Sequence, residues 1–454
     1  MNTNKRAGWH QVVMTYRKFQ VSLSPQQNLL FGFATYTVLG CLLLCIPFFQ
    51  NQSVAWVDNL FIATSAISTT GLVTISVADS YNGWGQVIVL GLIQIGGVGY
   101  MTFTSFVMLS FKSNLTHWHQ RVLNSEFSMP KGFFIHDFLK AVIVFTVLIE
   151  ALGAVALFIA FRDAGVEHNA AIWSSIFHSI SAFCTAGFSL YNNSFESFVD
   201  NVPVVSIISV LSIFGSLGFI VVTDFWNRLS GKTKIISYTS RIILLALFTL
   251  ISVGTLIIFF FEPSMQVLRP GTRWLAAFFQ SMTALTTVGF NTIPLQGIVL
   301  PVLLVIVLLM YVGASPSGTG GGMKSTTFVA LIAIMVSRIR GKSNVTFLGK
   351  AIPLERMYVA TSTFMLYASV IFVATFLLSV TESFSLEQIL FETTSAIGTV
   401  GLSVGITASL STAGKLILVA VMFVGRLGVI TFGLAILAKR KKIATKEDEA
   451  DLAV

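Results

Sequence analysis

The 454-residue chain is 54% hydrophobic and only 10% charged, with a mean hydropathy of +0.82. Soluble proteins carry about 25% charged residues, so this composition excludes a soluble globular domain and indicates a membrane protein. The formal net charge of +9 does not indicate a nucleic-acid partner, because the basic residues form short clusters between apolar stretches.

The segment 1–28 is polar and basic and lacks an apolar core before a small-residue cleavage site. It is therefore predicted to be a cytoplasmic tail and not a signal peptide. Eight apolar stretches follow, each at least about as long as the 20 residues that cross a bilayer. They form four pairs: 29–49 with 84–111, 138–161 with 203–225, 240–261 with 298–336, and 357–380 with 413–438.

One motif separates the two members of every pair. It is Phe-x3-[Ser/Thr]-Ala-apolar-x-Thr-x-Gly-[Leu/Phe], and it occupies residues 61–72, 177–188, 279–290 and 391–402. Four copies in register are an internal repeat. They divide the chain into pore repeats 29–111, 112–225, 226–338 and 339–438, before a second cytoplasmic tail at 439–454.

A short apolar segment leads up to the Thr-x-Gly of each motif. These segments are 56–68, 172–184, 274–286 and 386–398. Segments of this length are re-entrant more often than they span a membrane, and irregular backbone at membrane depth is tolerated where it lines a water-filled path. The predicted fold is an all-α membrane protein with eight transmembrane spans. Its four helix–pore loop–helix repeats surround one pore with pseudo-fourfold symmetry.

The distribution of charge predicts the orientation. Lys and Arg cluster in the first tail and in 112–140, 228–241, 338–356 and 439–446. The positive-inside rule therefore places both termini in the cytoplasm and the motifs toward the outside. The opposite loops are acidic, which would concentrate cations at the pore mouth, although each acid singly is equally well explained as solvated loop charge. These acids are Asp58, Asp79, Asp163, Glu167, Glu196, Asp200, Glu262, Glu382, Glu387 and Glu392.

The Thr-x-Gly end of the motif suits a cation filter. A ring of backbone carbonyls replaces the water shell of K⁺ without a fixed charge that would trap the ion, and glycine adopts the backbone angles that this requires. Threonine and glycine are also common close-packing residues of membrane helices, but four aligned copies favour a filter. The predicted K⁺-binding residues are Thr69, Thr70, Gly71, Thr185, Ala186, Gly187, Thr287, Val288, Gly289, Thr399, Val400 and Gly401.

The third repeat is interrupted within its second apolar stretch. Residues 313–324 contain a proline and several glycines, which cannot sustain a helix. A phosphate-binding loop is disfavoured because Met323 stands where the second glycine of that motif is needed. A packing kink and a flexible plug in the pore remain, and we favour the plug. Its predicted gating residues are Gly313, Ser317, Gly318, Thr319, Gly320, Gly321, Gly322 and Lys324.

Arg426 lies deep in the last apolar stretch, at the position that Gly97, Ser216 and Ala314 hold in the other repeats. A charge at the centre of a membrane helix costs at least about 2.5–3.5 kcal/mol and is a functional hypothesis by default. We expect Arg426 to bond carbonyls or hydroxyls of the 315–322 loop, or a carboxylate, and so to favour the closed state. The alternative is a structural arginine that joins helices.

Two further polar residues lie inside the repeats. Glu150 is predicted either to hydrogen-bond a neighbouring helix or to contribute to ion coupling, and His178 to cap or pack in the second pore segment. No zinc-protease, serine-hydrolase or paired-carboxylate pattern stands out, so the sequence does not predict an enzyme.

Four helix–pore–helix repeats with one filter glycine each resemble the superfamily of K⁺ transporters that contains KtrB, TrkH and the plant HKT proteins. The resemblance covers residues 29–438. Eight spans after a short tail are more similar to KtrB than to TrkH, which carries two additional amino-terminal helices. In the HKT branch a serine at the first filter position accompanies Na⁺ preference, so Gly71 implies K⁺.

The resemblance implies an ion-conducting subunit of a bacterial plasma-membrane K⁺ uptake system, gated by an intramembrane loop. It also implies a homodimer, stimulation by Na⁺, no organic cofactor in this chain, and a cytosolic KtrA-like nucleotide-binding (RCK-type) ring as regulator. The alternatives are a TrkH-like K⁺ transporter and an ion-coupled secondary cation symporter, for which broken helices are also typical.

Overall fold

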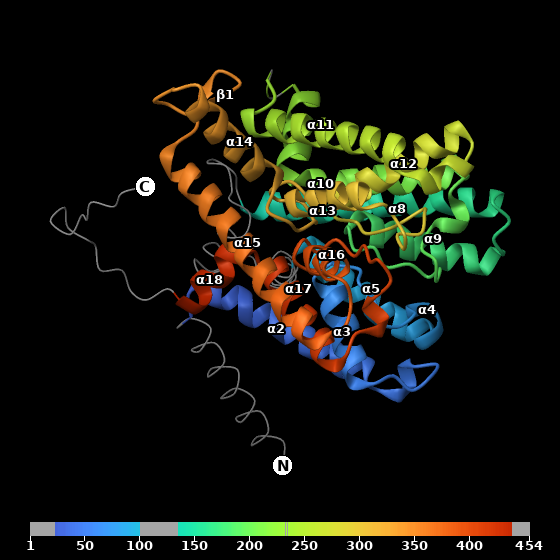
Figure 1. The fold of residues 1–454 in the computed structure, drawn as a ribbon. Coiled ribbons are helices and arrows are strands. Elements are labelled where there is room, and N and C mark those ends of the chain that lie inside the picture. The colour runs from blue at the N-terminus through green and yellow to red at the C-terminus, as the bar shows by residue number, and fades with distance from the viewer. Residues whose placement is uncertain (1–22, 100–134, 232, 234, 438–454) are drawn as a thin grey trace, which may run out of the picture.

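The computed structural model describes residues 23–99, 135–231, 233 and 235–437. Within these ranges the chain is built from helices joined by loops, with one short β-hairpin, which confirms the all-α class (Figure 1). The predictions for most of the first tail, for the basic stretch up to residue 134 and for the second tail lie outside the described residues.

Each unit begins with a long helix: α2 (Pro25–Leu44), α8 (Ile135–Asp163), α11 (Tyr238–Phe261) and α15 (Leu354–Thr381). The helix α2 begins at Pro25, inside the stretch 1–28 that the sequence assigns to the first tail. The Ser24 hydroxyl accepts a hydrogen bond from the Gln27 amide and the Gln27 side chain bonds back, and this capping box with proline at the first position starts a helix there.

Each unit continues with a short pore helix: α3 (Trp56–Ile67), α9 (His168–Phe183), α12 (Pro270–Thr286) and α16 (Leu386–Ile397). These are the four short segments that the sequence predicts. Each stops beside the filter threonine because that threonine has a left-handed backbone, with φ of 52°, 51°, 58° and 48° in chain order. A left-handed residue ends a helix. The phenylalanine that opens each motif, Phe61, Phe177, Phe279 or Phe391, is buried and anchors the pore helix.

The second helices are α5 (Gly83–Val98), α10 (Val202–Leu229), α13 (Leu300–Val312) with α14 (Ser325–Ile339), and α17 (Thr412–Leu427) with α18 (Val429–Leu437). The predicted interruption of the third is present, between α13 and α14. A glycine with positive φ lies inside α10 (Gly218, 80°), at the end of α13 (Gly313, 67°) and between α17 and α18 (Gly428, 81°). Gly99, with φ of 87°, follows α5 at the end of the first described range. Residues other than glycine rarely adopt a positive φ. At Gly428 this conformation ends α17, and α18 continues at an angle of 98°.

Among the described helices, five are long and apolar enough to cross a membrane, or six if α17 and α18 form one span. They make the chain a multi-pass membrane protein. The helices α5, α13 and α14 are shorter than the roughly 20 residues that a span needs, so the number of eight spans stays a prediction.

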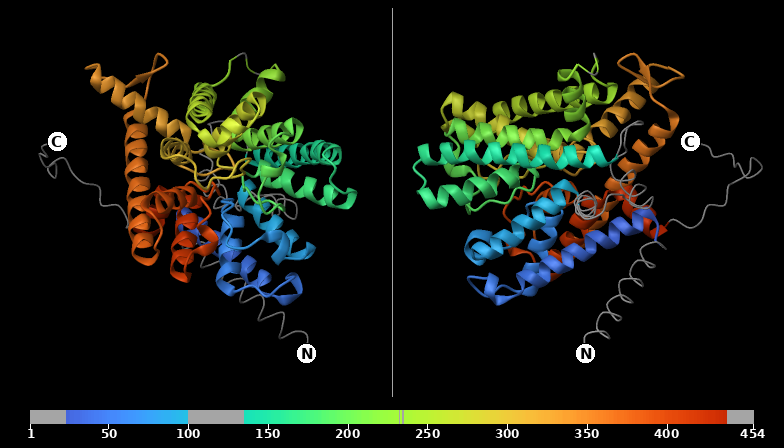
Figure 2. Two further views of the ribbon diagram at one scale, coloured as in Figure 1. Left: turned by 45° about the vertical axis from the view of Figure 1, so that its right-hand side comes forward. Right: turned by 180° about the vertical axis from the view of Figure 1, so that it is seen from behind.

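The units are arranged in a circle. Each second helix packs on the pore helix of the next unit: α5 on α9, α10 on α12, α13 on α16, and α17 back on α3. In the turned view of Figure 2 the blue, green, yellow and orange-red parts of the chain surround a common centre. The four motifs therefore meet in the middle of the molecule.

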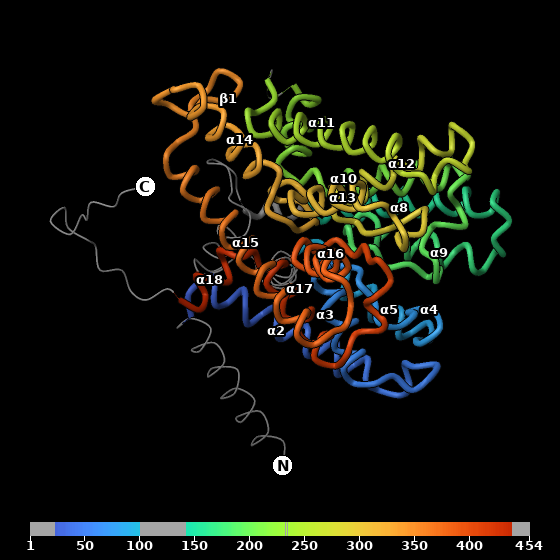
Figure 3. Tube along the Cα trace, in the orientation of Figure 1, coloured from blue at the N-terminus to red at the C-terminus, as the bar shows by residue number. Residues whose placement is uncertain are grey.

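The sequence did not predict the hairpin of β1 (Thr346–Phe347) and β2 (Lys350–Ala351). Its two central residues, Leu348 and Gly349, have φ of 47° and 76°, as a tight two-residue turn between antiparallel strands requires. The hairpin joins α14 to α15, on the opposite side of the molecule from the short helix α4 (Val77–Ser80), as the tube of Figure 3 shows.

Candidate ion-selective ring and the loop beneath it

After each pore helix the chain makes the same turn. The amide of the middle residue of Thr-x-Gly donates to the carbonyl of the motif's earlier Ser or Thr, with N···O distances of 2.8–3.2 Å. The four pairs are Thr70 to Ser65, Ala186 to Ser181, Val288 to Thr283, and Val400 to Ser395. The repeated sequence thus encodes a repeated backbone conformation.

The hydroxyl of the motif's Ser also bonds the filter segment, a role that the sequence analysis did not assign to it. Ser65 Oγ accepts from the Gly71 amide at 3.0 Å and Ser395 Oγ from the Gly401 amide at 3.1 Å. Ser181 Oγ donates to the Phe188 carbonyl at 2.8 Å. The signal was present, since every motif has Ser or Thr at this position.

The four filter glycines lie in a closed ring. Their φ angles are 90° at Gly71, 66° at Gly187, 83° at Gly289 and 92° at Gly401. A side-chain carbon on any of them would collide with a carbonyl oxygen of the next unit. In order, these oxygens belong to Ala186, Val288, Val400 and Thr70. The structure thus brings the twelve predicted filter residues together, and each Thr-x-Gly segment passes directly against its neighbour.

The interrupted stretch of the third unit lies against this ring and contacts the filter threonine of every unit. The Thr319 carbonyl accepts from Thr69 Oγ1 at 3.4 Å, and Thr319 Oγ1 meets Thr185 Oγ1 at 3.0 Å. The Gly321 amide donates to Thr287 Oγ1 at 3.2 Å. Gly321 also packs so closely on the Thr399 hydroxyl that a side chain would not fit.

Two of the predicted gating residues, Gly313 and Gly322, bring the two ends of this loop together. Gly313 and Gly322 both have positive φ, and their backbones touch, so neither position has room for a side chain. The amide of Met323 donates to the Tyr311 carbonyl at 3.2 Å, and that of Lys324 to the Val312 carbonyl at 3.0 Å. The loop therefore starts at the end of α13 and returns to the same point before α14 begins.

The loop docks into the break of α10. The Ser315 hydroxyl bonds the carbonyls of Ser216 and Leu217 at 2.6 and 2.5 Å, and the Phe219 amide donates to the Ser317 carbonyl at 3.2 Å. A helix that is interrupted exposes carbonyls and amides that need partners. The break at Gly218 supplies such groups, and the loop satisfies them.

Two cationic side chains bind successive carbonyls of the loop. The Arg426 guanidinium donates to the Thr319 carbonyl, to Thr69 Oγ1 at 3.0 Å, and to the carbonyl of Gly96. Lys324 Nζ donates to the Gly320 carbonyl at 2.7 Å. The predicted contact between Arg426 and the loop is confirmed, and its place between units 1, 3 and 4 also joins helices.

Glu150 lies behind the filter segment of the second unit. Its carboxylate accepts from Gln94 Nε2 of α5 at 3.2 Å and from Cys184 Sγ at 3.6 Å. The predicted hydrogen bond to a neighbouring helix is therefore present. A contribution to ion coupling stays a prediction.

Only part of the predicted acidic face is free. Asp58 pairs with Lys415 at 2.7 Å, Glu382 bonds Ser411, and Glu262 and Glu392 are buried. Hydrogen bonds from Asn192 and Ser76 lower the pKa of the exposed Asp79, which therefore stays ionised. The exposed acids are Asp79, Asp163, Glu167, Asp200 and Glu387.

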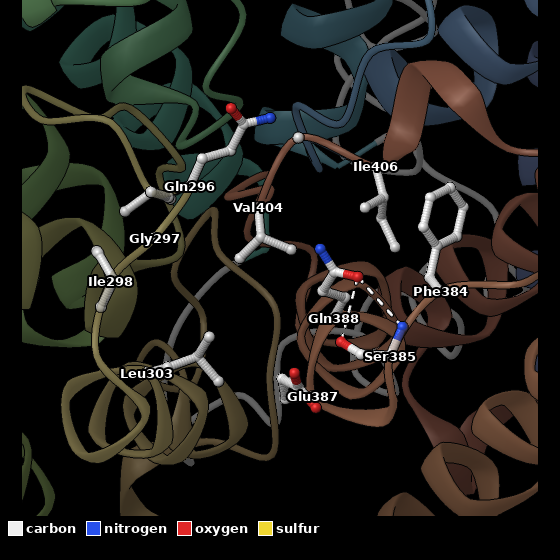
Figure 4. A pocket seen from close by; sticks show the side chains of 12 residues that line it. Gln296, Gly297, Ile298, Leu303, Phe384, Ser385, Glu387, Gln388, Val404 and Ile406 are labelled. Atoms are coloured by element: carbon white, nitrogen blue, oxygen red, sulfur yellow. Dashed lines mark hydrogen bonds between the residues drawn. The ribbon is translucent and has the colours of Figure 1, made fainter.

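A cavity of about 580 Å³ lies between the loop that follows the third filter segment and the start of α16 (Figure 4). Glu387 and Gln388 line it, and the Gln388 side-chain oxygen accepts from the Ser385 amide at 3.2 Å. A hydrogen bond from Ser385 lowers the pKa of Glu387. The Glu387 carboxylate gives the lining of this cavity a negative charge, which attracts cations.

The comparison with known proteins agrees with this geometry. The profile of a family described as "TrkH: Cation transport protein" matches residues 32–443. The chain belongs to the TrkH family of cation transport proteins. A TrkH-family fold is also what the structure shows. The crystal structure of the potassium transporter TrkH from Vibrio parahaemolyticus is similar with a TM-score of 0.73 at 20% identity, over 91% of this chain and 85% of that one.

Characterised relatives of the TrkH family match along most of their length. The Ktr system potassium uptake protein B of Vibrio alginolyticus is 33% identical over 89% of both chains. The protein of the same name from Bacillus subtilis is 31% identical over 91% of this chain and 93% of its own. The potassium/sodium uptake protein NtpJ of Enterococcus hirae is 33% identical over 94% of this chain and 97% of its own.

Proposed function

We propose that this chain is the ion-conducting membrane subunit of a bacterial K⁺ uptake system. The single observation that supports this most is the closed ring of four Thr-x-Gly segments. In this ring the glycine of each segment lies against a backbone carbonyl of the next segment. Backbone carbonyls arranged in this way can replace the water shell of K⁺. The names of the relatives from Vibrio alginolyticus and Bacillus subtilis, potassium uptake proteins, support the same ion.

The loop 313–324 is the gate in this proposal. In the present conformation it occupies the hydroxyls of Thr69, Thr185 and Thr287, so these oxygens are not available to an ion. Arg426 binds the Thr319 carbonyl from α17, and Lys324, the last residue of the loop, binds the Gly320 carbonyl. A cation beside the path repels K⁺. The closed state thus blocks the pore both sterically and electrostatically, and opening requires these bonds to break.

The assembly and its regulation are also part of the proposal. Two copies of the chain form a homodimer on a cytosolic KtrA-like, RCK-type nucleotide-binding ring, with both termini in the cytoplasm. Two relatives are named as the B proteins of a Ktr system, which supports a partner subunit. Stimulation by Na⁺ is supported by the name of NtpJ, a potassium/sodium uptake protein.

The test of conduction is the uptake of radioactive rubidium by liposomes that contain the purified chain. We expect uptake to follow an imposed voltage without any gradient of Na⁺ or H⁺, because 100 mV contributes about 2.3 kcal/mol per charge. Liposomes without protein are the control. Uptake that requires a co-ion gradient would contradict the pore and favour the ion-coupled symporter.

Replacement of Arg426 by alanine is expected to raise basal rubidium uptake by about tenfold. A hydrogen bond from a charged group contributes about 1.5–3 kcal/mol, and about 1.4 kcal/mol changes an equilibrium tenfold, so its loss shifts the loop toward the open state. The measurement is voltage-driven uptake in the absence of the cytosolic partner.

The matched control for this variant is Arg162→Ala. Arg162 is exposed at the end of α8 and bonds the Val166 carbonyl at 2.8 Å, away from the ring, so basal uptake should not change. If Arg426→Ala assembles normally and its basal uptake equals that of the wild type, Arg426 only joins helices.

A further inference from the structure

The second residue of each motif occupies one structural position in four chemically different forms. It is Ile62, His178, Gln280 or Glu392, always directly after the buried phenylalanine of the pore helix. All four side chains are buried. Two of them bond the segment that leaves the filter, and two do not.

In the fourth unit Glu392 bonds this segment. Its carboxylate accepts from the Ser403 hydroxyl and from Thr407 Oγ1 at 2.9 Å, and the two hydroxyls also lie 2.9 Å apart. Ser403 lies two residues after the filter glycine Gly401. Burial of a carboxylate is costly without partners, and the Val404 amide donates a third hydrogen bond to Glu392.

In the second unit His178 makes the equivalent bonds. Its Nδ1 lies 2.7 Å from the Ser174 carbonyl, which assigns the hydrogen to Nδ1. Its Nε2 then accepts from Ser189 Oγ at 3.1 Å and from the Leu190 amide at 3.2 Å. Ser189 lies two residues after the filter glycine Gly187, as Ser403 does after Gly401.

The other two units lack this contact. Ile62 cannot form a hydrogen bond, and the side-chain nitrogen and oxygen of Gln280 have no partner among the described residues. Asn291, two residues after Gly289, donates to Glu196 at 2.7 Å instead. Because the ring runs from unit 1 to unit 4 in order, the two units with this contact face each other across the pore.

We propose that Glu392 and His178 are positioning residues for selectivity, each holding the segment that follows a filter glycine in opposite units of the ring. The inference rests on the proposed function, since it presumes that the ring selects K⁺. It assigns to these side chains the task of keeping the carbonyl ring at the size that K⁺ requires. Gln280 and Ile62 do not have this task.

The test compares variants of the full chain in liposomes by the ratio of rubidium to sodium uptake. We expect Glu392→Ala to reduce this ratio by about tenfold, since it removes the bonds of the carboxylate to Ser403, Val404 and Thr407. Glu392→Gln should keep the ratio near that of the wild type, because an amide accepts from one hydroxyl and donates to the other. The matched control at the same motif position is Gln280→Leu, which should leave the ratio unchanged.

Several outcomes would overturn the proposal: a wild-type ratio in Glu392→Ala, an equal loss in Glu392→Gln, or a similar loss in Gln280→Leu. An equal loss in the glutamine variant would mean that the negative charge of Glu392, and not its hydrogen bonds to the segment, determines the uptake ratio. If Glu392→Ala does not assemble, Ser403→Ala removes the partner instead and should lower the ratio in the same direction. A ring that is not the filter is recognised separately, because Gly401→Ser would then leave the ratio unchanged as well.

Discussion

Replacement of Gly71 or Gly401 by serine is expected to reduce the preference for K⁺ over Na⁺ by about tenfold or more, which corresponds to about 1.4 kcal/mol. Both glycines have φ near 90°, at 90° and 92°, where a side chain is strained. The added carbon would also collide with a carbonyl of the next unit, that of Ala186 or Thr70. Each substitution therefore displaces a carbonyl of its own segment and one of its neighbour's.

The measurement is the ratio of rubidium to sodium uptake, together with growth of a K⁺-uptake-deficient strain at low K⁺. Gly91→Ser is the matched control, because Gly91 lies in α5 of the same unit with nothing near its missing side chain. Wild-type selectivity in both filter variants would remove the ring from its proposed role.

Deletion of Ser317–Gly322 is expected to have the second large effect, a rise of about tenfold or more in basal uptake and the loss of control by the proposed cytosolic partner. The deletion removes the carbonyls that Arg426 and Lys324 bind and the contacts with the filter threonines. With several such bonds lost, each contributing about 0.5–1.5 kcal/mol, the closed state has little left to favour it.

A single substitution tests the same idea if the deletion variant does not fold. Thr319→Ala removes only the hydroxyl that meets Thr185 and donates to the Phe183 carbonyl at 3.1 Å, and its uptake should lie between wild type and deletion. The control is Thr361→Ala, since Thr361 is exposed and its hydroxyl donates to the Met357 and Tyr358 carbonyls of its own helix, α15. A deletion variant with wild-type uptake, with and without the partner, would show that the loop does not gate.

Much of the site was predictable because it is repeated. The Thr-x-Gly ends and the short pore helices follow from four aligned motifs, and the loop follows from glycines and a proline inside an apolar stretch. The serines of the motif are equally visible in the sequence, but their role is not. Only the structure shows that the Ser65 and Ser395 hydroxyls accept hydrogen bonds from the Gly71 and Gly401 amides. The breaks at Gly218 and Gly428 were missed because a single glycine inside a long apolar run does not by itself distinguish close packing from positive φ.

The sequence by itself determined the membrane character, the four units and the chemical type of the proposed filter. These depend on composition and local backbone preference, which are properties of short segments. The tertiary structure decided which groups meet: the order of units around the ring, the loop beneath the threonines, Arg426 on the Thr319 carbonyl, and Glu392 on the segment after Gly401. Such contacts join residues far apart in the chain, and their geometry arises only when all four units pack against one another.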